Sequence, residues 1–143
     1  MTTSAIKSEK VLYTAKFHTT GGHEHYESHN SDGHLDIKHS LLGSPGSGTN
    51  PEQLLAADWS ACFELAMGLA ALKRKITLPA DTAIDAEVDL CNTDGAYFRR
   101  ARLTVCLPGL EHDVAQALVD TADETCPYFK TTRCNVDATI NLV

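Results

Sequence analysis

Histidines and cysteines are the residues of this chain whose types could do chemistry. Six of the seven histidines lie between His18 and His39, around the stretch TTGGHEHYESHNSDGH at 19–34. Imidazoles at that density could bind a metal, could act as acid–base groups, or could simply cover a solvent-exposed hairpin. The cysteines, at 62, 91, 106, 126 and 134, include no C-x-x-C pair. That spacing argues against a thioredoxin motif and against a structural zinc site.

The bulk properties restrict the classes of protein to consider. With 143 residues, 43% of them hydrophobic and 22% charged, we expect one globular domain over residues 1–143, with 1–9 as a flexible N-terminal segment. The formal charge of −7 argues against nucleic-acid and membrane partners. The first ten residues, MTTSAIKSEK, do not form a secretory signal, and polar residues interrupt the longest apolar run. We therefore expect a cytoplasmic protein without a membrane span.

Alternating patterns predict the strands. Residues 10–18 alternate as a half-buried strand, and residues 34–39 follow with Leu35 and Ile37 on one face. Residues 84–91 and 97–107 predict a hairpin around NTDG, and VDATINLV at 136–143 predicts a closing strand. In that hairpin, charge and hydrophobicity favour a register that pairs Glu87 with Arg100, Asp85 with Arg102, Ile84 with Leu103 and Ala86 with Ala101.

Two helices complete an α+β class. Asn50 can cap a helix that has Pro51 at its first position and that ends near the cations at 73–75. The middle of this helix is apolar nearly all round, so a second subunit is a reasonable cover for it. Residues 111–125 predict the second helix.

Several segments in order resemble the organic hydroperoxide resistance (Ohr) proteins of the OsmC-like superfamily: KVLYTA, TTGG, SDGHLDIK, GTNPEQLLAADWSACFELA, LPGLEHDVAQALVDTADETCPY and TTRCNVDATINLV. The most specific motifs are NPEQL…SACF and ALVD…CPY. The resemblance extends from about residue 10 to the carboxyl end. It implies an OsmC-like fold, in which antiparallel sheets wrap around two central helices in an intertwined homodimer.

The resemblance also implies a thiol peroxidase. By position, Cys62 is the peroxidatic cysteine and Cys126 the resolving one. A thiolate attacks ROOH, the resulting sulfenic acid condenses with the second thiol, and an external dithiol reduces the disulfide. The family's donor is typically dihydrolipoamide on a lipoylated protein, so no bound cofactor or metal is expected. An apolar pocket would favour alkyl or fatty-acid hydroperoxides.

The chain departs from the Ohr pattern at two places. Ohr proteins carry an arginine just after TGG that pairs with the glutamate of NPEQ, which is Glu52 here. In this chain His23 follows TTGG, and the segment is one residue longer than expected. Asp58 stands one helical turn before Cys62, where the family usually has glycine, and we expect its carboxylate to disfavour the thiolate.

Three readings of the histidine run stay open. His23 or His25 could replace the arginine near Cys62 and be oriented by Glu52, while His29 and Glu27 share their strand face. The run could instead be a solvated loop or a metal site. The rival functions are accordingly a catalytically weak OsmC-like protein that binds apolar ligands and a histidine-rich metal-binding protein. Cys91, Cys106 and Cys134 match no catalytic position, and we interpret them as structural or incidental.

Overall fold

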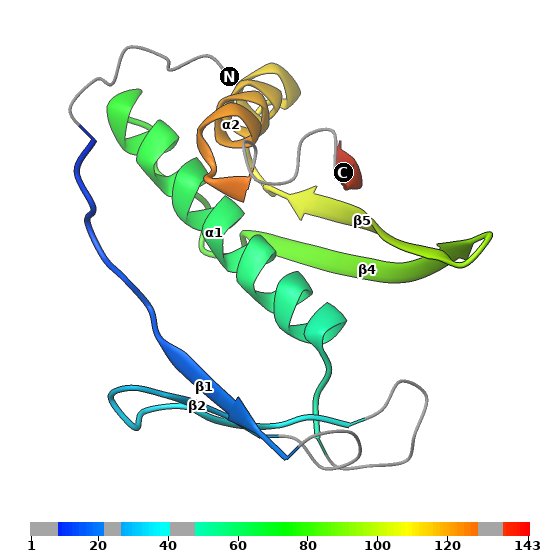
Figure 1. The fold of residues 1–143 in the computed structure, drawn as a ribbon. Helices are drawn as coiled ribbons and strands as arrows, with labels where there is room; N and C mark the ends of the chain where they lie inside the picture. Colours follow the sequence, from blue (N-terminus) through cyan, green and yellow to red (C-terminus); the bar gives the residue numbers. More distant parts are fainter. Residues whose placement is uncertain (1–8, 22–26, 41–47, 129–135) are drawn as a thin grey trace. The chain divides into compact units, whose positions relative to one another are not determined.

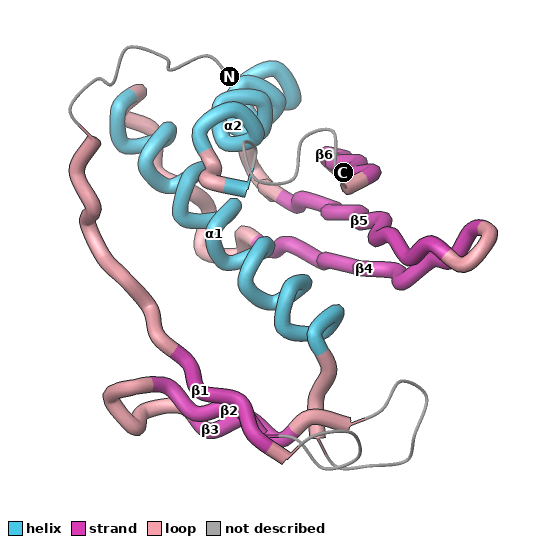
Figure 2. The backbone as a smooth tube through the Cα atoms, in the orientation of Figure 1, coloured by secondary structure: helices cyan, strands magenta, loops and turns pink. Residues whose placement is uncertain are grey.

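The structure is a computed structural model that describes residues 9–21, 27–40, 48–128 and 136–143. The chain divides into two compact units, Met1–Asn50 and Pro51–Val143, and each unit contains a three-stranded sheet. Figure 1 follows the chain through both units, and Figure 2 marks their helices and strands. The predicted α+β class is confirmed. The prediction of a single domain stays a prediction, and residues 1–8 of the expected N-terminal segment lie outside the described residues.

The second unit packs two helices against a sheet. Its elements are α1 (Pro51–Lys73), β4 (Ala83–Thr93), β5 (Ala96–Cys106), α2 (His112–Thr125) and β6 (Asp137–Leu142). The helix α1 contacts both α2 and β4. Both helices begin and end within two residues of the predicted positions. Acidic residues in the first turn mark the start of each helix, Glu52 in α1 and Asp113 in α2, and Lys73 lies in the last turn of α1.

The helix α1 is long and apolar enough to cross a membrane by length and composition alone, with a mean hydropathy of 1.3 in its most apolar window. The core helix of a soluble protein passes the same test. Two carboxylates, Asp58 and Glu64, interrupt the apolar run of α1, and side chains such as Phe63 and Met67 are completely buried in this unit. These features favour a core helix.

The β4–β5 hairpin has a different register from the predicted one. Glu87 pairs with Arg102 and Val88 with Ala101, so each predicted pair is shifted by two residues. The reason is the turn: it contains only Asp94 and Gly95, at φ 51° and 85°, rather than the four residues of NTDG. Asp-Gly is a favoured two-residue hairpin turn because both positions need positive φ. A shift by two keeps every side chain on its predicted face.

The strand β6 runs parallel to β5, with Leu103 opposite Ile140. The prediction of purely antiparallel sheets is therefore wrong for this pair. The physical reason is the connection, because α2 carries the chain back along the sheet before β6 begins. A parallel pair requires such a crossover.

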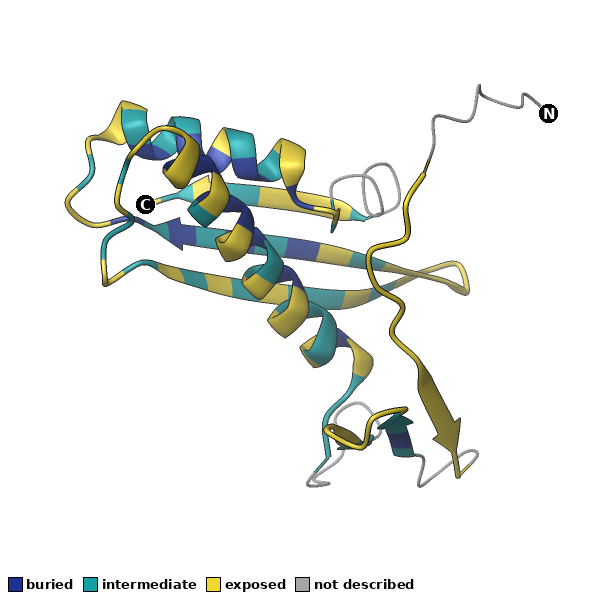
Figure 3. Cartoon of the chain, turned by 90° about the vertical axis from the view of Figure 1, so that its left-hand side faces the viewer, coloured by how far each residue is buried: buried dark blue, intermediate teal, exposed yellow. Residues whose placement is uncertain are grey.

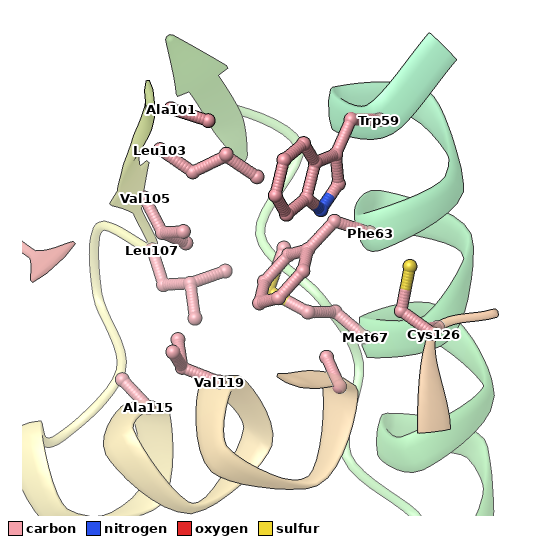
Figure 4. Close-up of a cluster of buried hydrophobic side chains, with 12 residues drawn as sticks. Trp59, Phe63, Met67, Ala101, Leu103, Val105, Leu107, Ala115, Val119 and Cys126 are labelled. Carbon is pink, nitrogen blue, oxygen red and sulfur yellow. The ribbon is translucent and has the colours of Figure 1, made fainter. Parts of the chain in front are cut away.

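The core of the second unit lies between α1, α2 and β5. Figure 4 shows Trp59, Phe63 and Met67 of α1 facing the side chains of β5. Along β5, Ala101, Leu103 and Val105 are completely buried, as their alternation predicted. Figure 3 colours the chain by burial and shows dark blue, buried bands on both the helices and the sheet of this unit. The core thus fixes one face of α1, the face next to Cys62.

The first unit is a small antiparallel sheet of β1 (Phe17–Thr20), β2 (Glu27–Asn30) and β3 (Asp36–Lys38). The predicted half-buried strand over 10–18 is wrong for the single chain. Only Phe17 and His18 of that range belong to a strand, and Val11, Leu12 and Tyr13 are highly exposed. A strand needs a hydrogen-bonding partner and a cover for its apolar face, and the single chain gives residues 10–16 neither a paired strand nor burial.

Candidate functional site

Cys62 and Cys126 lie side by side although 64 residues separate them in the sequence. The thiol of Cys126 donates to the sulfur of Cys62, and the two Sγ atoms are 3.3 Å apart. Cys62 lies in the middle of α1 and is half-buried, while Cys126 is the buried residue that ends α2. Two sulfurs at this distance need only a small movement to form a disulfide of about 2.05 Å.

The environment of Cys126 keeps its thiol protonated. Burial, together with the neighbouring Cys62 and Asp123, raises the pKa of Cys126 to about 11, although a backbone hydrogen bond at Tyr128 acts to lower it. The local backbone places the thiol here, because Cys126 leaves the helix with φ −60° and ψ 129° and its amide still donates to the carbonyl of Ala122. The thiol of Cys126 is the hydrogen-bond donor and keeps its proton, whereas the sulfur of Cys62 is the acceptor. This arrangement leaves Cys62 as the cysteine that reacts first and Cys126 as the second thiol.

An apolar groove opens beside Cys62. Its volume is about 340 Å³. It is lined by Cys62, Leu65, Ala66, Leu69, Ala70, Lys73, Thr121, Thr125 and Pro127. The lining comes from α1 and from the end of α2, so the same two elements position the sulfurs and shape the groove. Such a surface suits a molecule with a hydrocarbon part.

Glu52 forms an ion pair with Arg99 at the start of α1. Both Nε and Nη2 of Arg99 lie 3.2 Å from Oε1 of Glu52. The Glu52 side chain is only 10% exposed and that of Arg99 is 42% exposed. Ten residues along a helix span about 15 Å, so Glu52 cannot touch Cys62 of its own chain. The predicted catalytic role of Glu52 at Cys62 stays a prediction, and in one chain its carboxylate belongs to a separate site.

Arg99 is a residue that the sequence reasoning missed. It has the same parity in β5 as Ala101, Leu103 and Val105, which face the core. A cation at an inward position of an apolar strand face predicts a buried anionic partner, because an unpaired charge there is costly. That signal was present in the sequence, but the partner Glu52 lies 47 residues away and could not be identified from spacing.

Asp58 and Tyr128 form a second contact around the sulfur pair. The hydroxyl of Tyr128 donates a hydrogen bond to Oδ2 of Asp58. The Tyr128 ring also stacks on the indole of Trp59, with ring centroids 5.4 Å apart and an interplanar angle of 11°. Burial and Asp58 raise the pKa of Tyr128, so the phenol stays a hydrogen-bond donor. The expected effect of Asp58 on the Cys62 thiolate stays a prediction.

Residues 44–141 match the family model described as OsmC-like protein. The chain belongs to the OsmC-like family. It is 43% identical over 138 residues to an organic hydroperoxide resistance protein of Xanthomonas axonopodis pv. citri, covering 94% of this chain and 96% of that protein. It also resembles the solved structure of organic hydroperoxide resistance protein OhrB of Bacillus subtilis, with a TM-score of 0.85, 36% identity, and coverage of 93% and 100% of the two chains.

A second solved structure agrees with the assignment. The organic hydroperoxide resistance protein of Elizabethkingia anophelis matches with a TM-score of 0.86 and 30% identity, covering 94% of this chain and 98% of that one. The resemblance to Ohr proteins and the OsmC-like fold are therefore confirmed for this OsmC-like chain.

The histidine hypothesis of this OsmC-like protein is untested. His23 and His25 lie outside the described residues. His29 lies in β2, where its Nδ1 is 2.8 Å from Oδ1 of Asp36 and its Nε2 is 3.6 Å from Glu27. Over the described ranges, His, Cys, Asp and Glu side chains form no group of three that could hold a metal ion. The hypothesis of a metal site stays open for the histidines of the run that lie outside the described residues.

The other cysteines of the OsmC-like chain lie on the hairpin or outside the described residues. Cys91 pairs with Phe98 near the turn of the hairpin, and Cys106 pairs with Ala83 at its other end. Both are half-buried. Cys134 is outside the described residues. The interpretation of these three cysteines as structural or incidental stays a prediction.

Proposed function

We propose that this OsmC-like protein is a cysteine-based peroxidase that reduces organic hydroperoxides to alcohols. Relatives named organic hydroperoxide resistance proteins support a role in hydroperoxide detoxification. The observation that carries the proposed mechanism is the 3.3 Å contact between the sulfurs of Cys62 and Cys126 beside an apolar groove.

The first step oxidises Cys62. Its thiolate attacks the distal oxygen of ROOH, the O–O bond breaks, and the alkoxide takes a proton and leaves as the alcohol. Cys62 becomes a sulfenic acid. The Cys126 thiol donates its proton in the hydrogen bond to Cys62, and its pKa is raised to about 11, so Cys126 stays protonated. Cys62 is therefore the better nucleophile of the two cysteines.

The second step forms the disulfide, and an external dithiol then reduces it. The sulfur of Cys126 attacks the sulfenic sulfur, the S–O bond breaks, and hydroxide leaves with the thiol proton as water. A dithiol then restores both thiols by exchange and is itself oxidised to a disulfide. The family resemblance makes dihydrolipoamide on a lipoylated protein the proposed donor.

The groove supports organic rather than inorganic peroxides as substrates. Apolar side chains such as Leu65, Ala66 and Leu69 line the path to Cys62. Burying the hydrocarbon part of ROOH there stabilises the complex by about 25 cal/mol for each Å² removed from water. Hydrogen peroxide has no such part and gains nothing from the groove.

A homodimer is part of the proposal. Three leucines of α1 are exposed in the single chain: Leu65 by 66%, Leu69 by 55% and Leu72 by 73%. Val11, Leu12 and Tyr13, which precede β1, are exposed as well. Isolated apolar side chains on a surface are common, but a helical stripe of leucines indicates an interface. A second copy on this stripe would also close the groove.

A cytoplasmic location also belongs to the proposal. The mechanism needs Cys62 and Cys126 as thiols at the start of each cycle. The cytoplasm keeps thiols reduced, whereas oxidising compartments favour stable disulfides.

Peroxidase turnover tests the function. We expect turnover with tert-butyl or fatty-acid hydroperoxide in a dihydrolipoamide-recycling system, and a much slower reaction with hydrogen peroxide. Cys62→Ser should abolish turnover, and the matched control Cys91→Ser should retain it. Rates for the unmodified protein that are no higher than those of Cys62→Ser would contradict the enzyme.

The groove itself favours the second candidate, a binding module for apolar ligands. The same experiment separates the two functions. A module would bind the hydroperoxide without consuming it, whereas the enzyme releases one alcohol for each hydroperoxide.

A further inference from the structure

The residues next to the two cysteines form a second bridge between α1 and the end of α2. Asp58 lies four residues before Cys62 and therefore on the same face of α1. Tyr128 lies two residues after Cys126. The Tyr128 hydroxyl donates to Asp58, and the Tyr128 ring stacks on Trp59. The sulfur contact and this hydrogen bond thus join the same two segments at adjacent points.

The chain between Cys126 and Tyr128 is stiff. Pro127 has a fixed φ and restricts the residue before it to extended conformations. Cys126 has such a conformation, with φ −60° and ψ 129°. Because the backbone of this tripeptide has little freedom, holding the Tyr128 ring on α1 also restricts where the backbone of Cys126 can lie.

We propose that Asp58 and Tyr128 are positioning residues for the step that joins Cys62 to Cys126. Their hydrogen bond holds the Cys126–Tyr128 segment on α1, so that the second thiol stays next to the first one after it has been oxidised. The inference rests on the proposed function and concerns the disulfide step alone.

Two reactions compete for the sulfenic acid of Cys62. In the first, Cys126 attacks it and water leaves, which gives the disulfide. In the second, its sulfur takes an oxygen atom from another ROOH, which releases ROH and leaves a sulfinic acid that thiols do not reduce. The first reaction is intramolecular, so its rate depends on how often the Cys126 sulfur is within reach. The hydrogen bond between Asp58 and Tyr128 therefore protects the enzyme from inactivation.

Asp58 is a departure from the pattern that the Ohr resemblance implies. The Ohr resemblance expects glycine at that position, and glycine has no side chain to accept a bond from Tyr128. The carboxylate that the sequence predicted to be unfavourable beside Cys62 has a definite partner in the structure. The raised pKa of Tyr128 agrees with a phenol that donates to this carboxylate.

The test measures the fractions of oxidised Cys62 that end as the disulfide and as the sulfinic acid. Reduced protein is titrated with tert-butyl hydroperoxide, and intact mass with peptide mapping quantifies both products. The variants are Tyr128→Phe, which keeps the ring and removes the hydroxyl, and Asp58→Asn, which keeps an acceptor oxygen and removes the charge. The first oxidation is followed separately as peroxide consumed in a single turnover.

We expect Tyr128→Phe to reach half over-oxidation at a peroxide concentration about tenfold lower than the unmodified protein, because a hydrogen bond to a charged group is lost. Asp58→Asn should show a smaller change, since a neutral acceptor gives a bond about half as strong. The double variant should equal Tyr128→Phe, because both changes remove one shared interaction. Tyr97→Phe, on the exposed end of the hairpin, is the matched control and should behave as the unmodified protein.

The outcomes separate this inference from the proposed function. If the unmodified protein forms no Cys62–Cys126 disulfide with hydroperoxide, the peroxidase mechanism is wrong. If that disulfide forms but Tyr128→Phe and Asp58→Asn give the same ratio of disulfide to sulfinic acid as the unmodified protein, only the positioning role is wrong. Thermal unfolding of each variant identifies any general loss of structure. If Tyr128→Phe folds poorly, Asp58→Asn still tests the positioning role, because Asp58 is exposed.

Discussion

The β4–β5 hairpin and the β1–β2–β3 sheet show how differently two antiparallel regions of one chain use similar alternating sequences. From Ala101 on β5 to Leu107 just after it, every second residue is buried under the helices. In the first unit, Ser28 is the one buried residue among the described positions 9–21 and 27–40. Alternation predicts which side chains share a face of a strand, but burial requires another element to cover that face.

The comparison also separates two kinds of chemistry. The second unit holds both sulfurs of the proposed reaction in a fixed geometry. In the first unit, His18 and His29 lie on short strands, His34 lies between β2 and β3, and His39 follows β3. His29 contacts Asp36. Chemistry that depends on precise distances is therefore expected in the covered region.

The largest expected difference between the two regions is the cost of removing a leucine. Leu103→Ala should lower the free energy of unfolding by about 2–5 kcal/mol, because Leu103 is completely buried and its loss leaves a cavity. Leu35→Ala, the matched change in the first unit, should cost less than about 1 kcal/mol because Leu35 is half exposed. Chemical denaturation at one protein concentration measures both. An equal cost would mean that the first unit is covered in solution.

The next largest expected effect concerns the proposed dimer interface. Light scattering should give about twice the chain mass of 15.5 kDa for the unmodified protein. Leu69→Glu should weaken the dimer by about tenfold or more, since it places an unpaired charge in the proposed interface. Ala80→Glu, in an exposed loop, is the control and should stay dimeric. A stable monomer of the unmodified protein at micromolar concentration would contradict the dimer.

A smaller effect is expected at the ion pair of β5. Arg99→Leu should lower the free energy of unfolding by about 1–2 kcal/mol, because it leaves the buried Glu52 without its cation, while the partial exposure of Arg99 weakens the pair. Arg100→Leu removes an exposed pair with Asp137 and should change stability by less than about 0.5 kcal/mol. Denaturation curves compare the two. Equal losses would show that burial of Glu52 is unimportant.

The smallest effect is a pH dependence in the first unit. The hydrogen bond that His29 donates to the carboxylate of Asp36 raises the pKa of His29. The stabilisation from this contact is therefore fully present below the unfolded pKa of about 6.5, and it is lost as pH rises through the higher folded value. An NMR titration should show the pKa of His29 fall in Asp36→Asn and stay raised in Asp32→Asn. No difference between these variants would exclude Asp36 as the cause.

Local features of the sequence were sufficient for the helices and for the faces of the strands. Asn50 and Pro51 mark the start of α1, and the parity of β5 identifies its buried residues. These predictions succeeded because caps and periodicity act within one or two turns. The register of the hairpin was wrong only because Asp94-Gly95 was not treated as a complete turn, although that signal is also local.

The sequence by itself thus determined the class, the two helices, the family and the two cysteines of interest. Only the tertiary structure brought Cys62 to Cys126, Glu52 to Arg99 and Asp58 to Tyr128, across separations of 64, 47 and 70 residues. It also decided that β6 is parallel to β5 and that residues 10–16, before β1, are exposed in one chain. Periodicity records the side of an element on which a residue lies, whereas the partner across that face depends on how distant elements pack together.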